Sequence, residues 1–249
     1  MNVGRVNVAL VFAASAAITV AWCGSMSGMP GMEMPGGWTM SMAWMRMPGQ
    51  GWLGFAATFL GMWTVMMTAM MLPAFAPMLG RYRRELRVEN KGTLSACVAA
   101  GYFAAWGFLG MVLLPFGVGF AELAMRVPAV SKAVPFMSAL VVMAAGLAQF
   151  TAWKSRQLAC CRHTIDCCRD TQPNYRAAWR HGLKIGARCV YCCAGLTAVL
   201  LVIGVMDLLA MALVTIAISA ERLSPARRSF APRAIGVGLF MFGTSMLFA

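Results

Sequence analysis

The chain has 249 residues, of which 60% are hydrophobic before its 25 glycines are counted, and only 12% are charged. Soluble domains contain about 45–50% apolar residues with glycine included, and about 25% charged residues. This composition excludes one large soluble domain, because so few charges cannot cover a water-exposed surface, and it also excludes an intrinsically disordered chain. We therefore expect an all-α, polytopic transmembrane helical bundle that forms a single integral membrane domain over residues 1–249.

Hydrophobic segments of membrane-helix length follow one another along the chain. A helix needs about 20 apolar residues to cross the hydrocarbon core. Seven segments are candidates: 6–23, 52–79, 93–119, 134–153, 185–205, 207–221 and 233–249. Because the sixth is short enough to be tilted or re-entrant, we expect six or seven spans. The first has some features of a signal peptide, but its apolar run of about 17 residues is long for that role, and we expect it to be retained.

Lys and Arg residues alternate between rich and poor loops. Three segments contain five, eight and four of them, respectively: 80–92, 154–188 and 222–233. The N-terminus and the remaining loops contain two or fewer each. Cytoplasmic loops are enriched in Lys and Arg, so the pattern predicts an N-in, C-out, multi-pass protein of a bacterial inner membrane. An anionic membrane face accounts for the net charge of +13, and we expect no nucleic-acid partner.

The predicted outer loop, residues 24–51, is rich in methionine, and its Gly, Pro and Ser residues predict a flexible segment. Its eight methionines are Met26, Met29, Met32, Met34, Met40, Met42, Met45 and Met47. Thioether sulfur is a soft ligand suited to Cu(I), and unlike a thiol it forms no disulfide in an oxidising compartment. We predict that this loop captures Cu(I); a flexible linker of biased composition is the alternative.

The second span continues the methionine pattern. Met62, Met66 and Met70 follow one another at i, i+4 steps on one helix face, and Met67 and Met71 form a neighbouring row. Ordinary packing accounts for any single methionine. Five of them within ten residues, next to a methionine-rich loop, favour a sulfur-lined path or metal site.

Seven of the nine cysteines lie at or near the predicted inner face. Residues 154–184 form a Cys- and His-containing cytoplasmic loop with the motif CC-x-H-x3-CC, and C-x-x-CC follows in the fifth span. The candidate ligands are Cys160, Cys161, His163, Cys167, Cys168, Cys189, Cys192 and Cys193. Cytosolic thiols stay reduced, and thiolates with imidazole bind Cu(I) or Zn. Redox-active and inert cysteines are the alternatives, and the isolated Cys23 and Cys97 are expected to be structural.

The run GVMDLLAM places Asp207 between Met206 and Met211 at the predicted outer mouth of the sixth span. An ionisable residue in a membrane segment is a functional candidate, but Asp is also a good helix N-cap, and both interpretations remain open. At the other end of this span, Glu221 is adjacent to Arg222, and we expect these two residues to pair.

Catalytic motifs are scarce. The chain contains no G-x-S-x-G, nucleotide-binding loop or H-E-x-x-H motif. Its two histidines cannot build a His-rich oxygen-activating site. We therefore expect no organic cofactor and no enzyme active site, with a membrane thiol oxidoreductase using C-x-x-CC as a minor alternative.

Four segments resemble the DUF2182 family of predicted metal-binding integral membrane proteins: 63–78 (WTVMMTAMMLPAFAPM), 101–110, 145–154 and 179–221. The resemblance covers nearly the whole chain and implies a multi-span bundle that binds metal, without an established reaction. The matching positions are Met66, Met67, Met70, Met71, Pro73, Cys189, Cys192, Cys193, Met206, Asp207, Met211 and Glu221. Family members tend to have Asn at position 207, which implies that the charge there is not essential. The cysteine pairs 160/161 and 167/168 exceed the family pattern.

These features together predict a copper-binding membrane protein that transfers Cu(I) from outer methionines to inner cysteines, which are stronger ligands. Zn and Ag(I) also fit the thiol sites. Without an ATPase motif, transport across the membrane would be passive or coupled by a partner. The alternative is a non-transporting chaperone or accessory subunit that loads a partner enzyme. The expected partners are the bilayer, the metal ion and a periplasmic or membrane copper protein; the sequence does not fix an oligomeric state.

Overall fold

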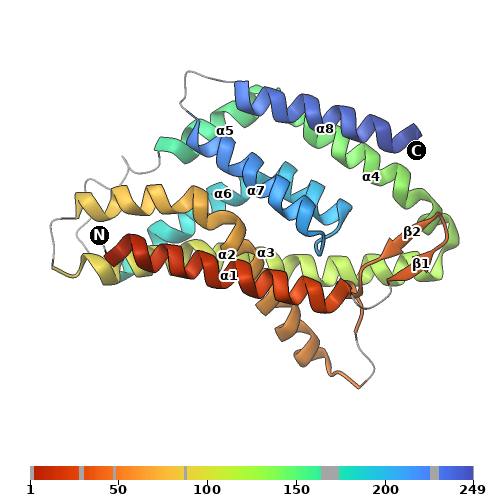
Figure 1. The fold of residues 1–249 in the computed structure, drawn as a ribbon, viewed down its shortest axis with the longest axis horizontal. Coiled ribbons are helices and arrows are strands. Elements are labelled where there is room, and N and C mark those ends of the chain that lie inside the picture. Colours follow the sequence, from red (N-terminus) through yellow and green to blue (C-terminus); the bar gives the residue numbers. More distant parts are fainter. Residues whose placement is uncertain are drawn as a thin grey trace.

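The computed structural model describes residues 3–27, 31–46, 49–86, 89–163, 174–224 and 230–248. In these residues the chain forms a bundle of helices (Figure 1): α1 (Val3–Ser27), α2 (Trp52–Glu85), α3 (Lys91–Arg126), α4 (Pro128–Ala148), α5 (Ala152–His163), α6 (Tyr175–Ile203), α7 (Leu208–Leu223) and α8 (Phe230–Phe248). Two short strands, β1 (Met32–Met34) and β2 (Trp38–Met40), and a 3-10 turn, η1 (Met42–Trp44), lie between α1 and α2. The prediction of an all-α bundle is confirmed.

Six of the described helices are long and apolar enough to cross a membrane: α1, α2, α3, α4, α6 and α8. The chain is therefore a membrane protein. The predicted sixth span corresponds to α7, whose 16 residues extend about 24 Å, less than the hydrocarbon core of about 30 Å. It runs back along α6, and the two termini lie at opposite ends of the bundle (Figure 1). The described residues thus contain six helices long enough to span a membrane, together with the shorter α7.

Several boundaries differ from the sequence prediction: α2 and α3 end at Glu85 and Arg126, later than the expected 79 and 119. The span expected over 134–153 begins earlier, at Pro128, and ends at Ala148, after which α5 forms a separate helix. The helix that contains the C-x-x-CC motif begins at Tyr175, before the apolar segment expected from residue 185. Residues 175–184 include Arg176, Arg180, His181 and Lys184, and these polar side chains interrupt the apolar run, so hydrophobicity gave no signal for this part of α6.

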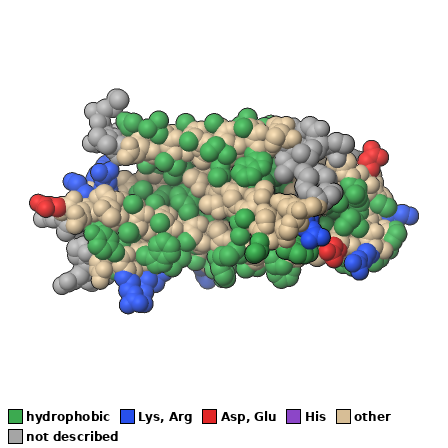
Figure 2. All heavy atoms as spheres, turned by 90° about the horizontal axis from the view of Figure 1, so that it is seen from below, with side chains coloured by type: hydrophobic (Ala, Val, Ile, Leu, Met, Phe, Trp, Pro, Cys, Tyr) green, Lys and Arg blue, Asp and Glu red, His purple; other side chains and the backbone are tan. Residues whose placement is uncertain are grey.

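The outside of the bundle is apolar. Leu53, Phe116 and Phe230 are more than 70% exposed. Figure 2 shows hydrophobic side chains along the middle of one face, with Lys and Arg side chains toward the two ends. Soluble monomers rarely expose such large apolar areas, so this surface fits contact with lipid.

Helices α3 and α6 pack with their backbones in close contact. A Cβ atom added to Gly182 would overlap the carbonyl group of Val98, and one added to Gly101 would lie 2.5 Å from the carbonyl oxygen of Trp179. Small residues allow such close approach between membrane helices. The contact brings Tyr102 of α3 next to Cys189 of α6, with 3.0 Å between the hydroxyl oxygen and the sulfur.

Replacing Gly182 with alanine, G182A, is expected to lower the free energy of unfolding by about 1–3 kcal/mol, because the new methyl group forces α3 and α6 apart. Denaturant unfolding in detergent, followed by tryptophan fluorescence, measures this change. The control is G61A on α2, where an added Cβ meets no atom within 4 Å. We expect G61A to be neutral or stabilising, since alanine favours helix. If G182A and G61A lowered the free energy of unfolding equally, the result would contradict the close contact between α3 and α6.

Residues 32–40 of the methionine-rich segment form a β-hairpin, where composition predicted a flexible loop. Its turn has positive φ at Gly36 (115°) and Gly37 (75°), a conformation that glycine adopts readily. The Trp38 indole N–H donates to the carbonyl oxygen of Ser131 at 2.9 Å, and the Ser131 hydroxyl donates to the carbonyl oxygen of Pro35 at 2.8 Å. These bonds tie the hairpin to α4, over 90 positions away in sequence, which composition could not indicate.

Candidate functional site

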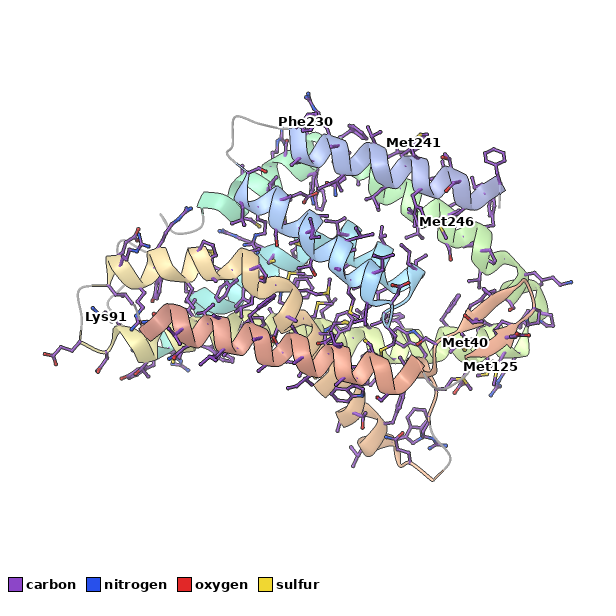
Figure 3. All side chains as sticks on the ribbon, in the orientation of Figure 1. Met40, Lys91, Met125, Phe230, Met241 and Met246 are labelled. Carbon is purple, nitrogen blue, oxygen red and sulfur yellow. The ribbon has the colours of Figure 1, made fainter. Side chains whose placement is uncertain are left out.

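Three methionines of the hairpin segment pack together against the end of α3. Met34 and Met40 are buried, and the partly buried Met45 packs against them. Figure 3 shows Met40 at the hairpin end of the bundle, near the end of α3. Met34, Met40 and Met45 are termed the hairpin cluster. Their side chains belong to one packed cluster at the hairpin end of the bundle.

A second sulfur group lies between α1, α2 and the turn that joins α6 to α7. A small cavity of about 10 Å³ is lined by Cys23, Met62, Met66 and Met206, together with three other residues. The Cys23 sulfur lies 3.9 Å from the Met206 sulfur. These four sulfur-containing residues are termed the cavity cluster. A cavity of this size holds about one water-sized particle, which is also the scale of a single metal ion.

The cavity cluster includes one cysteine that the sequence indicated as isolated and structural. Cys23 and Met206 are 183 positions apart, so no local spacing could connect them. Met62 and Met66 were candidates because of their helical spacing, and the structure places both beside Cys23. The structure thus adds a thiol to the predicted thioether ligands.

A third group lies at the centre of the bundle. Cys189, Cys192 and Cys193 of α6 are buried, and the buried Cys161 of α5 joins them. The sulfur atoms of Cys189 and Cys193 are 3.8 Å apart, as their i, i+4 spacing predicts. The Cys161 thiol donates to the carbonyl oxygen of Arg188 at 3.4 Å. These four cysteines are termed the thiol cluster.

A hydrogen bond with Cys192, followed in importance by burial, raises the pKa of the Cys161 thiol. Cys161 therefore holds its proton more tightly than a free thiol does. It must lose its proton before it can bind a metal as a thiolate.

Cys189 accepts hydrogen bonds from two side chains that sequence analysis did not select. The Tyr102 hydroxyl donates to its sulfur at 3.0 Å, and the Arg222 guanidinium donates at 3.1 Å. Arg222 also donates to the Tyr102 oxygen at 3.4 Å. A cationic donor beside a sulfur atom stabilises negative charge on it. This arrangement fits a thiolate whose charge is balanced by Arg222.

A buried ion pair adjoins the thiol cluster. Glu221, which the sequence suggested would pair with Arg222, lies 2.8 Å from the Lys154 ammonium, and both side chains are at most 5% exposed. The same ammonium donates to the carbonyl oxygen of Cys192 at 2.7 Å. Burial lowers the pKa of Lys154, but the Glu221 carboxylate and the neighbouring Cys192 and Cys193 together outweigh burial, and the pKa is raised. Lys154 therefore stays charged and ties α5 to α6 and α7.

Three further methionines of α2 lie between the second and third groups. Met67, Met70 and Met71 are buried in the same core as the thiol cluster, together with Met211 of α7. Phe75, one turn after Met71, stacks on Tyr102 with 4.2 Å between ring centroids. The nine residues from Met66 to Phe75 correspond to about 14 Å along the helix. Helix α2 thus runs from the cavity cluster to the side chain that contacts Cys189.

The structure supports the interpretation of Asp207 as a helix cap. Its exposed carboxylate accepts a hydrogen bond from the backbone N–H of Ala210 at 3.0 Å, at the start of α7. Met32 is 41% exposed. The other predicted ligands have side chains that lie outside the described part of the structure: Met26, Met29, Met42, Met47, Cys160, His163, Cys167 and Cys168.

No three Cys, His, Asp or Glu side chains among the described residues are placed to hold a metal ion together. Thioether sulfur and pairs of thiols are the soft ligands that the described residues offer to a metal ion.

Residues 60–246 match the PpoB2 family, described as copper chaperones. The chain belongs to this family. The predicted connection with copper is therefore supported, while the finer DUF2182 resemblance stays a prediction. The match extends from α2 to α8 and contains the whole thiol cluster, but it leaves out Cys23 and the hairpin. No curated protein and no solved structure gave a match.

Proposed function

We propose that this chain is a membrane copper chaperone that captures Cu(I) with thioether sulfur and transfers it within the membrane to the thiol cluster. The observation that carries the proposal is the environment of Cys189. Its sulfur lies 3.8 Å from that of Cys193 and accepts hydrogen bonds from Tyr102 and Arg222. In tetrahedral zinc sites, two sulfurs at about 2.3 Å from the ion are roughly this far apart, so the separation is short enough for one metal ion to bind both sulfurs.

Charge balance at this site favours a monovalent ion. Two thiolates and Cu(I) together carry one net negative charge, which the guanidinium of Arg222 neutralises. A divalent ion such as Zn²⁺ bound to the same two thiolates would leave the charge of Arg222 unbalanced. Unbalanced charge is costly in a low-dielectric interior. The site therefore suits Cu(I) or Ag(I) better than Zn²⁺.

The order of the three groups gives the proposed transfer a direction. The hairpin cluster offers only thioethers, the cavity cluster offers thioethers and one thiol, and the thiol cluster offers thiols alone. An anionic thiolate attracts Cu(I) more strongly than a neutral thioether, so transfer toward the thiol cluster lowers the free energy of the ion. The cysteines of the 154–184 loop would extend this series, and Met67, Met70, Met71 and Met211 line the proposed path.

The proposed location is a bacterial inner membrane, with the Lys- and Arg-rich end of the bundle in the cytoplasm. This orientation rests on the enrichment of basic residues in cytoplasmic loops. The proposed partner is a periplasmic or membrane copper protein, with a copper enzyme as the recipient that a chaperone requires. Transport across the membrane is the second candidate, because the three sulfur groups follow one another from the hairpin end into the bundle.

Two double variants test the sulfur groups: M62L/M66L in the cavity cluster and C189S/C193S in the thiol cluster. We expect each variant to lose one tightly bound Cu(I), and we expect the affinity at the thiol cluster to fall by at least about 100-fold, more than loss of an outer-shell partner costs. Competition with a Cu(I)-specific chelator measures affinity, and X-ray absorption counts the sulfur ligands. The matched controls are M137L/M241L, at exposed methionines, and C97S.

Unchanged stoichiometry and affinity in both double variants would refute the proposal. Copper flux into sealed vesicles distinguishes the two candidate roles, since a chaperone binds Cu(I) without moving it across the membrane. A reversible disulfide of Cys189 that cycles without metal would instead support a thiol oxidoreductase.

A further inference from the structure

A groove of about 1080 Å³ opens between α1, α2 and the start of α3. Its wall is apolar over most of its length and includes Phe12, Leu72, Ala76 and Leu79. It is larger than most small-molecule pockets, which measure about 300–1,000 Å³. None of the three sulfur groups lines it. It is termed the α1–α3 groove.

One end of this groove is cationic. Arg83 and Arg84 belong to the last turn of α2, Lys91 is the first residue of α3, and all three line the groove. Figure 3 places Lys91 beside the ends of α1 and α2. Among the described residues, ion pairs form between Arg126 and Glu122 and between Lys154 and Glu221. Neither pair includes a cation of the groove.

We propose that the α1–α3 groove binds one anionic phospholipid, with the phosphate held by Arg83, Arg84 and Lys91 and an acyl chain lying along Leu72, Ala76 and Leu79. A guanidinium offers a forked set of donors that matches phosphate oxygens. The start of α3 adds partial positive charge, and Asn90 makes no side-chain capping bond there. Basic pockets between membrane helices bind anionic headgroups in this way.

The dimensions of the groove fit a lipid of one leaflet. Leu72 and Arg83 are eleven residues apart on α2, which corresponds to about 16 Å. Half of the hydrocarbon core measures about 15 Å. A phosphate at the arginines therefore places the end of the acyl chain near Leu72. Free phosphate could use the same cations, but it would leave the apolar wall unused.

Lipid retention tests this proposal. The intact protein is incubated with phosphatidylglycerol or with phosphatidylcholine of the same chains, and native mass spectrometry measures the lipid retained in detergent. We expect retention of phosphatidylglycerol to exceed that of phosphatidylcholine by about tenfold or more, as two to three cations near an anionic lipid predict. R83Q/R84Q should remove this preference. R81Q changes a neighbouring arginine that does not line the groove and should retain the preference.

A second variant tests the apolar wall. A76F fills the groove while leaving all three cations in place, and it should reduce phosphatidylglycerol retention several-fold. Unchanged Cu(I) stoichiometry shows that each variant is folded. Equal retention of the two lipids by the unmodified protein would overturn the proposal, as would full retention by R83Q/R84Q. If excess inorganic phosphate displaced all the phosphatidylglycerol and A76F had no effect on retention, the groove would be a phosphate site. That result would also overturn the proposal.

Discussion

Replacing Lys154 with methionine, K154M, is expected to lower the free energy of unfolding by about 3–5 kcal/mol, the cost of removing one partner of a buried ion pair. Glu221 is 1% exposed and lies 2.8 Å from the ammonium that this change removes. The carbonyl group of Cys192 loses a donor in the same variant. Helix α5 would then be held less firmly against α6 and α7, and Cys161 would leave the thiol cluster.

Denaturant unfolding in detergent measures this loss, with K184M as a matched control at an exposed lysine of α6. Replacing both partners of the pair, as in K154M/E221L, should recover much of the stability, because well-packed apolar pairs often replace buried ion pairs without loss. If K154M loses no more stability than K184M, the pair does not hold α5 in place.

Replacing Arg222 with glutamine, R222Q, is expected to weaken Cu(I) binding by about 10- to 100-fold, the usual effect of losing an outer-shell partner of a metal ligand. Glutamine can still donate a hydrogen bond to Cys189, but it carries no charge. The site with two thiolates and Cu(I) would then keep one unbalanced negative charge. The same change should leave Zn²⁺ binding unchanged or stronger, since two thiolates neutralise a divalent ion.

Parallel titrations with Cu(I) and Zn²⁺ measure this shift in selectivity. R222K keeps the charge and should retain more Cu(I) affinity than R222Q, while R233Q removes an exposed charge on α8 as a control. Equal weakening of Cu(I) and Zn²⁺ in R222Q would show that Arg222 only supports the fold around Cys189.

The sequence by itself determined the membrane bundle and most of the sulfur chemistry. A bilayer requires about 20 apolar residues for each span, so hydrophobicity located α2 and α7 to within a residue at their first positions. Helical spacing likewise grouped Met62 with Met66, and Cys189 with Cys193, because residues four apart share a helix face. These are local properties, and a sequence pattern expresses local properties directly.

Only the tertiary structure decided which distant residues meet. It placed Cys23 beside Met206, joined Lys154 to Glu221, and brought Tyr102 and Arg222 to the sulfur of Cys189. It also folded the methionine-rich segment onto α4 through hydrogen bonds that its composition does not reveal. Periodicity shows which face of a helix is apolar, but not which helix packs against it. That choice depends on close contacts such as the one between α3 and α6, where glycines let the backbones approach.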